Sequence, residues 1–398
     1  MSLAMQFGAG NIGRGFMGQL FFEAGYETVF VDNNKALVAS LNKERQYTLH
    51  LLDAYSKKEV DLVISNFYAL HTDQSEQIAE SFSKAEIVGT AVGVKNLQAI
   101  SPLIAEGIAL CSREGQGPVD IYLCENAYSA AQDLKREVYN YLAPGVIDWA
   151  SRNIGFVGTS VARMVPAPSD RFKGQGPLFV VADSYHRLPY DGKASRAPQP
   201  PIEGMKAVRN FKAEVERKLF TYNVGHAALA YIGYLKGYSY VHEPFSDPCL
   251  FSIFEAALDE TTRALLKMYP EDLCADEQEE IREDVRIRFS NPMIMDTVQR
   301  VARDPIRKLG PEDRLIGSAR LCLVQGIFPE KIAFICGAAF CYDYPEDPEA
   351  VKLQNMIKVR GIEGTLKEVT VVDPESELGK RIISSYQELV KLKKQWKK

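Results

Sequence analysis

The sequence predicts an α/β protein in which a doubly wound parallel-sheet domain is followed by a mainly α-helical domain. Strand-like and helix-like segments alternate through the first half of the chain, as a doubly wound sheet requires. A glycine-rich turn directly follows the first apolar segment, at residues 3–7, where such a sheet begins its first helix. Beyond residue 205, apolar residues recur at three- and four-residue spacing, which predicts helices almost throughout.

The glycine-rich turn occupies residues 7–18, which read FGAGNIGRGFMG. Gly8 permits a tight turn, Gly10 lets the backbone approach phosphate groups, and Gly13 lets the new helix pack closely on its strand. A pyrophosphate at this position would meet the amide groups and the positive dipole end of that helix. The turn therefore predicts a Rossmann-type dinucleotide-binding domain, and the alternative is an ordinary tight turn from strand to helix.

An acidic residue, Asp32, ends the second strand-like segment, at residues 27–32. It lies 19 residues after Gly13, close to the spacing at which a carboxylate accepts hydrogen bonds from the ribose hydroxyls of adenosine. Such a carboxylate would repel a 2′-phosphate, and no Arg follows it directly, so NAD is the expected cofactor. The alternative is that Asp32 caps the next helix.

Further segments complete the expected sheet domain. Helices are expected at residues 35–43 and 74–83, and strands at 47–52, 61–64, 86–93 and 119–126. Ligands in doubly wound sheets bind outside the carboxyl ends of the strands, so the ends of the last two strands should lie near the glycine turn. The expected cofactor-binding residues are Phe7, Gly8, Ala9, Gly10, Asn11, Ile12, Gly13, Asp32, Thr90, Ala91 and Val92, with Glu125 and Asn126 in the same crevice.

The domain boundary is expected between residues 195 and 196. Residues 190–201 are rich in Pro and small residues, a composition that suits neither a helix nor a central strand. This gives an NAD-binding domain at 1–195 and a helical substrate-binding and catalytic domain at 196–398. Helices of the second domain are expected at residues 205–221, 226–236, 251–268, 277–288 and 312–325.

The composition indicates a cytoplasmic enzyme that acts on a small molecule. The 398 residues carry a formal charge of −5, which offers no basic surface for nucleic acid. No apolar run approaches the roughly 18 residues that span a bilayer, so no membrane partner is expected. Seven cysteines and five histidines are scattered, without Cys-x-x-Cys or His-x-x-x-His patterns, so neither a disulfide framework nor a metal site is expected.

A second informative segment, at residues 216–227, contains Lys218, Asn223 and His226. At about 100° per residue their side chains fall near 0°, 140° and 80° around a helix, so all three can point to one side. A buried Lys with a lowered pKa can remove the proton from an alcohol as hydride leaves its carbon. An amide and an imidazole could then hold the oxygen. The alternative is a solvated Lys, a helix-capping Asn and a structural His.

The chain resembles the polyol-specific long-chain dehydrogenase/reductase family in stretches that follow the family's order. They are FGAGNIGRGF at 7–16, TAVG at 90–93, CEN at 124–126, ERKLFT at 216–221, Asn223, GHA at 225–227, NP at 291–292, DP at 304–305, RKL at 307–309 and DRL at 313–315. The Tyr-x-x-x-Lys pair of short-chain dehydrogenases is absent.

The resemblance implies a metal-independent, NAD-linked oxidoreductase with a Rossmann-type domain and a helical domain. In it, Lys218 matches the general base, and Asn223 and His226 match contacts to the substrate oxygen and hydroxyls. Asn126 matches a polar residue between cofactor and substrate. The implied reaction is reversible hydride transfer between mannitol 1-phosphate and fructose 6-phosphate.

A phosphorylated substrate needs cationic side chains to hold its phosphate. Candidates are Arg303, Arg307 and Lys308, with Arg314 as a further one, because an Arg fork can grip phosphate in two places. The alternative for each is a solvated helix face or a surface salt bridge.

Two departures from the family pattern concern the substrate. Ala162 stands where the family usually has Asp, and the segment 178–187 has Ala182 and Arg187 in place of the expected Glu and aromatic character. Oxidation of an unphosphorylated polyol or a hexuronate is therefore an alternative function. A non-catalytic NAD-sensing protein is an alternative from another class.

Overall fold

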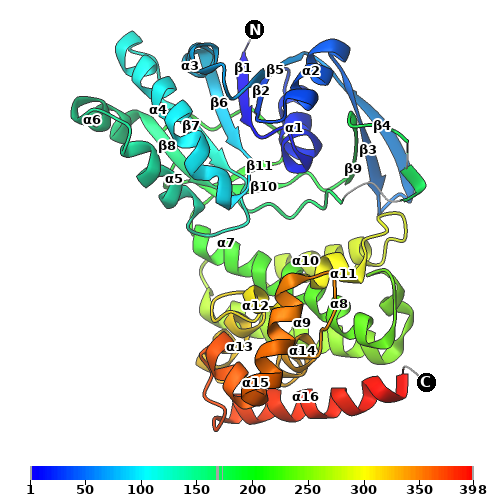
Figure 1. The fold of residues 1–398 in the computed structure, drawn as a ribbon. Coiled ribbons are helices and arrows are strands. Elements are labelled where there is room, and N and C mark those ends of the chain that lie inside the picture. The colour runs from blue at the N-terminus through cyan, green and yellow to red at the C-terminus, as the bar shows by residue number, and fades with distance from the viewer. Residues whose placement is uncertain (1, 167–169, 173, 397–398) are drawn as a thin grey trace. The chain divides into compact units, whose positions relative to one another are not determined.

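The computed structural model describes residues 2–166, 170–172 and 174–396. The chain forms two compact units, Met1–Glu214 and Val215–Lys398. Figure 1 colours the N-terminal unit from blue to green and the C-terminal unit from green to red.

A six-stranded sheet forms the centre of the N-terminal unit. Its order is β5-β2-β1-β6-β7-β8, and all neighbouring strands are parallel. The strands are β1 (Leu3–Phe7), β2 (Glu27–Asp32), β5 (Phe67–His71), β6 (Ala85–Thr90), β7 (Val119–Leu123) and β8 (Ile154–Gly158). This is the 3-2-1-4-5-6 order of dinucleotide-binding sheets, in which the winding direction reverses between β1 and β6. The predicted doubly wound sheet is confirmed.

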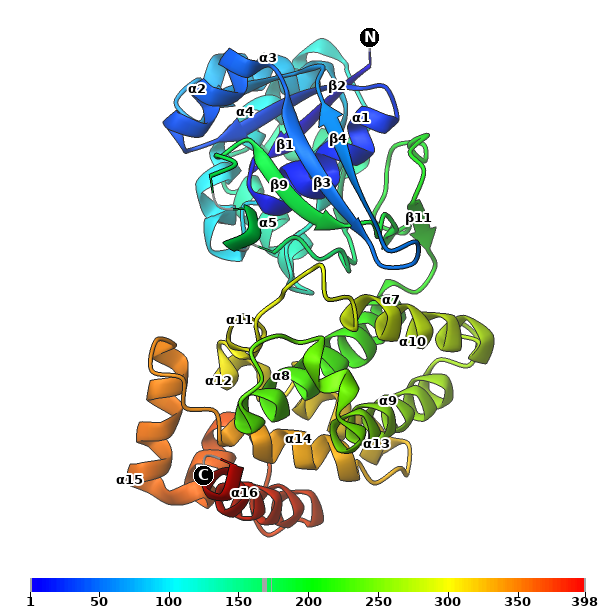
Figure 2. The ribbon, with the colours of Figure 1, turned by 90° about the vertical axis from the view of Figure 1, so that its right-hand side faces the viewer.

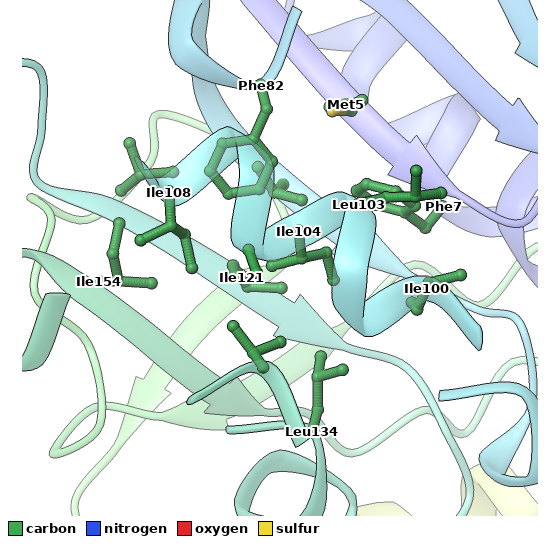
Figure 3. Packing of buried hydrophobic residues seen from close by; sticks show 14 of the residues in the cluster. Met5, Phe7, Phe82, Ile100, Leu103, Ile104, Ile108, Ile121, Leu134 and Ile154 are labelled. Carbon is green, nitrogen blue, oxygen red and sulfur yellow. The ribbon is translucent and has the colours of Figure 1, made fainter. Parts of the chain in front are cut away.

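Helices cover both faces of this sheet. One face carries α3 (Ser75–Lys84), α4 (Leu97–Glu114), α5 (Ala130–Tyr139) and α6 (Pro144–Asn153), and the other carries η1 (Gly13–Met17), α1 (Gly18–Glu23) and α2 (Lys35–Glu44). Figure 3 shows Ile104 of α4 packed near Phe7 and Ile121 of the sheet. Because side chains alternate along a strand, Met5 joins this cluster while its neighbour Ala4 joins the core of the opposite face.

A smaller three-stranded sheet lies beside the main one. β3 (Tyr47–Asp53) is flanked by antiparallel β4 (Lys58–Ile64) and parallel β9 (Phe179–Asp183), as Figure 2 shows. The strands expected at 47–52 and 61–64 therefore exist but do not belong to the main sheet. Most of β4 is exposed, whereas strands of a parallel sheet covered by helices are buried on both faces. The place beside β2 is taken by β5, which the sequence pattern did not reveal.

The segment around the expected domain boundary is tied to the N-terminal unit. Asp120, buried in β7, accepts hydrogen bonds from the Ser195 hydroxyl at 2.5 Å and the Arg196 backbone N–H at 2.7 Å. β10 (Leu188–Asp191) then pairs with β11 (Met205–Val208). The two units consequently divide between Glu214 and Val215, 19 residues after the boundary expected at 195/196. The helix expected at 205–221 starts only with α7 (Phe211–Lys218), because Met205–Val208 is a strand.

The C-terminal unit is helical. Its helices are η4 (Leu219–Asn223), α8 (Val224–Lys236), η5 (Glu243–Ser246), α9 (Pro248–Met268), α10 (Ala275–Phe289), α11 (Val298–Ala302), α12 (Pro305–Lys308), α13 (Ile316–Val324), α14 (Glu330–Phe340), α15 (Pro348–Thr370) and α16 (Glu377–Trp396). Helix α8 is buried on nearly every side and contacts α9, α11, α14 and α16. The helices expected at 226–236, 251–268, 277–288 and 312–325 are confirmed as α8, α9, α10 and a shorter α13.

Across the described part of the chain, no helix combines the length and the apolar character needed to cross a bilayer. All seven cysteines are free thiols.

Candidate active site

The glycine turn joins β1 to the first helix in the N-terminal unit. Gly8 has φ +89°, and a Cβ there would lie 2.6 Å from the Ala91 carbonyl oxygen. A Cβ on Gly13 would lie 1.8 Å from the Gly8 carbonyl oxygen, whereas one on Gly10 would meet nothing within 4 Å. Gly8 and Gly13 are thus required by close backbone approach. Gly10 instead leaves open space at the turn, as the approach of a phosphate requires.

Asp32, at the end of β2, binds this turn directly. One carboxylate oxygen accepts the Ala9 backbone N–H at 2.8 Å, and the other accepts the Asn34 backbone N–H at 2.9 Å. The cap of helix α2 is Asn34, whose side chain accepts from the Leu37 N–H at 3.1 Å, so the helix-cap alternative for Asp32 is wrong. A carboxylate offers about four lone-pair positions, so Asp32 retains acceptor capacity for ribose hydroxyls.

Arg14 holds the turn from the other side, a contact that the glycine pattern did not predict. Its Nε donates to the Ala9 carbonyl oxygen at 2.6 Å, and its Nη1 donates to the Pro177 carbonyl oxygen at 2.6 Å. Burial lowers the pKa of Arg14. The Ala9 residue therefore has its N–H held by Asp32 and its C=O held by Arg14. A cation among the small and apolar residues of 13–18 is the sequence signal that could have indicated this contact.

The loop after β6 lies against the glycine turn, as expected for Thr90, Ala91 and Val92. The Ala91 N–H donates to the Phe7 carbonyl oxygen at 2.8 Å. Glu125, just after β7, accepts the Thr90 hydroxyl at 2.7 Å and the Val92 N–H at 3.0 Å, and its burial raises its pKa. Glu125 therefore supports the loop.

The remaining expected residues of this unit differ in exposure. Phe7 and Ala9 are buried, Ile12 is partly buried, and Asn11 is exposed and donates to the Val165 carbonyl oxygen at 3.3 Å. Asn126, in the bend after β7, is exposed. The open space at Gly10 and the acceptor capacity of Asp32 together fit a dinucleotide.

In the C-terminal unit, Lys218, Asn223 and His226 lie on consecutive helical elements. Lys218 ends α7, Asn223 ends the π-helical turn η4, and His226 is in the first turn of α8. At the end of η4 the Val224 N–H donates to the Leu219 carbonyl oxygen, five residues back. A π-turn holds more residues than an α-turn, so each residue turns the chain by a smaller angle. The angle between the side chains of Lys218 and Asn223 around the helix axis is therefore smaller than the roughly 140° expected for an α-helix. Such turns are frequent at functional sites, and the apolar spacing did not reveal this one.

Lys218 is partly buried, and its pKa is lowered to about 7. The largest cause is desolvation of the ammonium, to which the positive charge of Arg314 adds. The Asp313 carboxylate acts in the opposite direction. A lysine with this pKa can both take up and release a proton near neutral pH, unlike a solvated lysine.

Asn223 is only 9% exposed and does not cap α8 through its side chain. Its amide nitrogen is buried and has no hydrogen-bond partner among the described residues. Buried amide groups in native proteins are nearly always paired, so an unpaired one requires an explanation. One explanation is that the Asn223 amide is a hydrogen-bond donor for a ligand oxygen.

His226 is flanked by an aromatic ring and a carboxylate. Its ring stacks on Phe289 with centroids 4.2 Å apart and planes 12° apart. Its Nε2 lies 3.6 Å from Oδ2 of Asp296. Burial lowers its pKa to about 3, with a smaller opposing effect from Asp296, so the imidazole is neutral at neutral pH.

Two of the candidate phosphate-binding cations share one carboxylate. Arg307 donates to Asp304 at 2.5 Å and to Asp313 at 2.7 Å. Arg314 is buried and donates through its Nε to the other oxygen of Asp313 at 2.9 Å. Arg307, Arg314 and Asp313 all lie within the electrostatic surroundings of Lys218.

The other two candidates are placed differently. Lys308 is 4% exposed, and its ammonium donates to the Arg303 carbonyl oxygen. Burial lowers the pKa of Lys308 well below its usual value. The Arg303 side chain is exposed.

The three positions that depart from the expected pattern lie in the N-terminal unit. Ala162 is partly buried, Ala182 is fully buried in β9 and pairs with Leu51, and Arg187 is exposed. Among the residues that the structure describes, no three or more His, Cys, Asp or Glu side chains are placed to hold a metal ion.

Family models match both units of the chain. The model of the mannitol dehydrogenase Rossmann domain matches residues 2–204, and that of the mannitol dehydrogenase C-terminal domain matches residues 210–390. The chain belongs to the mannitol dehydrogenase family. This confirms the resemblance seen in the glycine turn and the Lys218 segment.

Curated relatives are similar over nearly the whole chain. One is a mannitol-1-phosphate 5-dehydrogenase of Thermoanaerobacter pseudethanolicus, 36% identical over 390 residues, or 98% of this chain and 98% of the relative. A protein of the same name from Bacillus subtilis is 36% identical and covers 94% of this chain and 97% of its own length.

Solved structures share the fold. D-sorbitol dehydrogenase in substrate-free form has a TM-score of 0.81 at 18% identity, over 98% of this chain and 93% of that one. Mannitol 2-dehydrogenase of Pseudomonas fluorescens, in a ternary complex with NAD and D-mannitol, has a TM-score of 0.79 at 17% identity, over 98% and 92%.

Proposed function

We propose that the protein catalyses reversible, NAD-linked hydride transfer between mannitol 1-phosphate and fructose 6-phosphate. The substrate pair is supported by the relatives named mannitol-1-phosphate 5-dehydrogenase, which match over nearly the whole chain. The structural observation that carries the proposal concerns two residues on either side of one π-turn. Lys218 has a pKa of about 7, and the amide nitrogen of Asn223 is buried and has no hydrogen-bond partner among the described residues.

The N-terminal unit would hold NAD. The open turn at Gly10 would accept the pyrophosphate, and Asp32 would accept hydrogen bonds from the adenosine ribose, which favours NAD over NADP. NAD, when bound, supplies the hydride acceptor for the alcohol carbon. Asn126, which follows β7, is the contact to substrate that we assign to this unit.

Lys218 acts as the general base of the oxidation. Its neutral amine takes the proton of the substrate hydroxyl while the hydride leaves the carbon that bears this hydroxyl. The alcohol thereby loses two electrons and becomes a ketone. In the reduction, the ammonium of Lys218 returns the proton to the oxygen. The Asn223 amide donates to this oxygen and stabilises the negative charge that develops on it, and His226 contacts the substrate nearby.

The substrate phosphate is assigned to Arg314 and Arg307, with Arg303 and Lys308 as further contacts. The guanidinium of Arg314 donates only through its Nε to residues that the structure describes, so its two Nη groups are available to an anion. Asp313 holds both guanidinium groups and fixes their orientation. A preoriented Arg fork suits a phosphate, which it can bind in two places.

A parallel assay tests the reaction. NADH absorbance is followed with fructose 6-phosphate, fructose and fructuronate, each at the same concentration. We expect NADH consumption with fructose 6-phosphate. Turnover confined to fructose or fructuronate would instead support a polyol or hexuronate dehydrogenase, and turnover with none would support an NAD-sensing protein.

A substitution tests the base. Lys218→Ala should lower kcat at least tenfold while NADH affinity is unchanged, because only the proton acceptor is removed. Lys212→Ala is the matched control, since Lys212 is exposed on the same helix, α7. A smaller loss in Lys218→Ala with intact NADH binding would exclude Lys218 as the base.

A further inference from the structure

A buried carboxylate faces the ring of His226. Asp296 is 5% exposed, and its Oδ2 lies 3.6 Å from Nε2 of His226. This separation is slightly beyond hydrogen-bond range, so the contact acts through charge. The Phe289 ring stacked at 4.2 Å restricts rotation of the imidazole out of this orientation.

Asp296 is itself fixed in place. Arg300, one turn later, donates through Nε and Nη2 to its two carboxylate oxygens. The Val241 N–H donates to its backbone carbonyl at 2.9 Å, and Tyr240 forms an antiparallel bridge with Thr297. The carboxylate therefore presents one oxygen to His226 from a rigid position.

This arrangement selects one form of the imidazole. A neutral imidazole carries a single ring proton, and the hydrogen-bond role of each nitrogen depends on which one holds it. A carboxylate oxygen near Nε2 favours the proton on Nε2, since a lone pair there would be repelled. The other ring nitrogen, Nδ1, is then an acceptor.

We propose that Asp296 is a positioning residue that holds His226 in the Nε2–H tautomer, so that Nδ1 accepts a hydrogen bond from a substrate hydroxyl. The inference rests on the proposed function. It divides the substrate contacts between two residues: Asn223 donates to the reacting oxygen, and His226 accepts from a neighbouring hydroxyl of the polyol. His226 then neither donates to the developing alkoxide nor supplies a proton.

Selective labelling can read the tautomer directly. The chain has five histidines, so protein labelled with nitrogen-15 at His gives few signals, and His226→Gln assigns those of His226. At pH 7 we expect Nε2 of wild-type His226 to carry the proton and Asp296→Ala to show a mixture of tautomers. A wild-type Nδ1–H tautomer would overturn the proposal, and this measurement does not depend on the folding of any Asp296 variant.

Kinetics test whether the orientation matters for the reaction. Asp296→Ala should lower kcat/KM for the sugar phosphate at least tenfold without changing NADH affinity. Asp296→Asn, which keeps the size of the side chain but not its charge, should show most of the same loss, because the contact with His226 acts through charge. The matched control is Asp259→Asn, which breaks an exposed pair with Arg263 at the same four-residue spacing on α9. No loss in Asp296→Ala, or an equal loss in the control, would contradict the proposal.

The two measurements separate this inference from the proposed function. If wild-type protein turns over none of the three sugars, the proposed function fails. The tautomer of His226 still decides whether Asp296 orients it, because that reading needs no turnover.

Discussion

The carboxylate of Asp32 accepts the backbone N–H of Ala9 at 2.8 Å. One side chain thus fixes the glycine turn and also stands where a ribose would be recognised. The Ala9 carbonyl is held in turn by Arg14 at 2.6 Å. In the proposed function, coenzyme choice and the shape of the turn assigned to the phosphates would therefore depend on the same carboxylate.

Asp32→Ala should weaken NADH binding at least tenfold, or about 1.4 kcal/mol. The substitution removes both the proposed ribose acceptor and the hydrogen bond that orders the turn. Titration of NADH fluorescence measures the Kd, and the ratio of NADPH to NADH affinity should rise. Asp73→Ala is the control, because Asp73 is exposed and its ion pairs within the described part of the chain are with Lys35 and His71. An unchanged Kd in Asp32→Ala would remove Asp32 from the site.

Adding a methyl group to two glycines of the same turn should affect different properties, stability at Gly13 and NADH affinity at Gly10. Gly13→Ala places a Cβ 1.8 Å from the Gly8 carbonyl oxygen, so the backbone must shift. We expect the free energy of unfolding to fall by about 1–3 kcal/mol, the usual cost of adding a group to a well-packed protein interior. Thermal unfolding of the apoprotein measures it.

Gly10→Ala adds a methyl where nothing lies within 4 Å, so stability should change by less than about 0.5 kcal/mol. NADH affinity should nevertheless fall, because the methyl fills the space assigned to the pyrophosphate. Tight NADH binding by Gly10→Ala would show that the phosphates lie elsewhere.

The pH dependence of turnover should report Lys218. Because its pKa is lowered to about 7, oxidation, which needs the neutral amine, should rise with pH through about 7. Reduction, which needs the ammonium, should fall over the same range. Removing the positive charge in Arg314→Gln should move both midpoints to higher pH, since that charge lowers the pKa. Rates that do not vary between pH 5 and 9 would contradict the assignment.

Charge reversal should separate substrate from coenzyme. Arg307→Glu should raise KM for fructose 6-phosphate at least tenfold and leave KM for NADH nearly unchanged, because it places a carboxylate against the phosphate. Arg263→Glu, on the exposed side of α9, is the control for a general effect of charge. Equal increases in both Michaelis constants would exclude Arg307 from the phosphate site.

Features set by neighbouring residues could be predicted from the sequence. The turn at Gly8–Gly13, the acid at Asp32 and the apolar spacing of α8 and α9 each depend on a short stretch of chain. Backbone sterics and the period of side chains along an element act at that range, so the doubly wound sheet and the helical unit were both foreseen.

Long-range packing placed the rest. The strands β3 and β4 joined a separate sheet because β9, more than a hundred residues later, offered a parallel partner. Asp120 drew residues 195–197 into the N-terminal unit and so moved the division of the chain. Strand pairing and buried hydrogen bonds join residues far apart in sequence, and no local pattern records them.

The candidate site shows the same division. Lys218, Asn223 and His226 could be singled out as candidates from the sequence, because their spacing allows them to share one side of a helix and their segment resembles that of a known family. The sequence could not show the pKa of Lys218, the unpaired amide of Asn223 or the carboxylate beside His226. The pKa of Lys218 depends on burial and on the charge of Arg314, the unpaired amide depends on the burial of Asn223, and the carboxylate depends on the position of Asp296. Only the folded chain brings these groups together, because burial and contacts between distant residues are absent from the local sequence pattern.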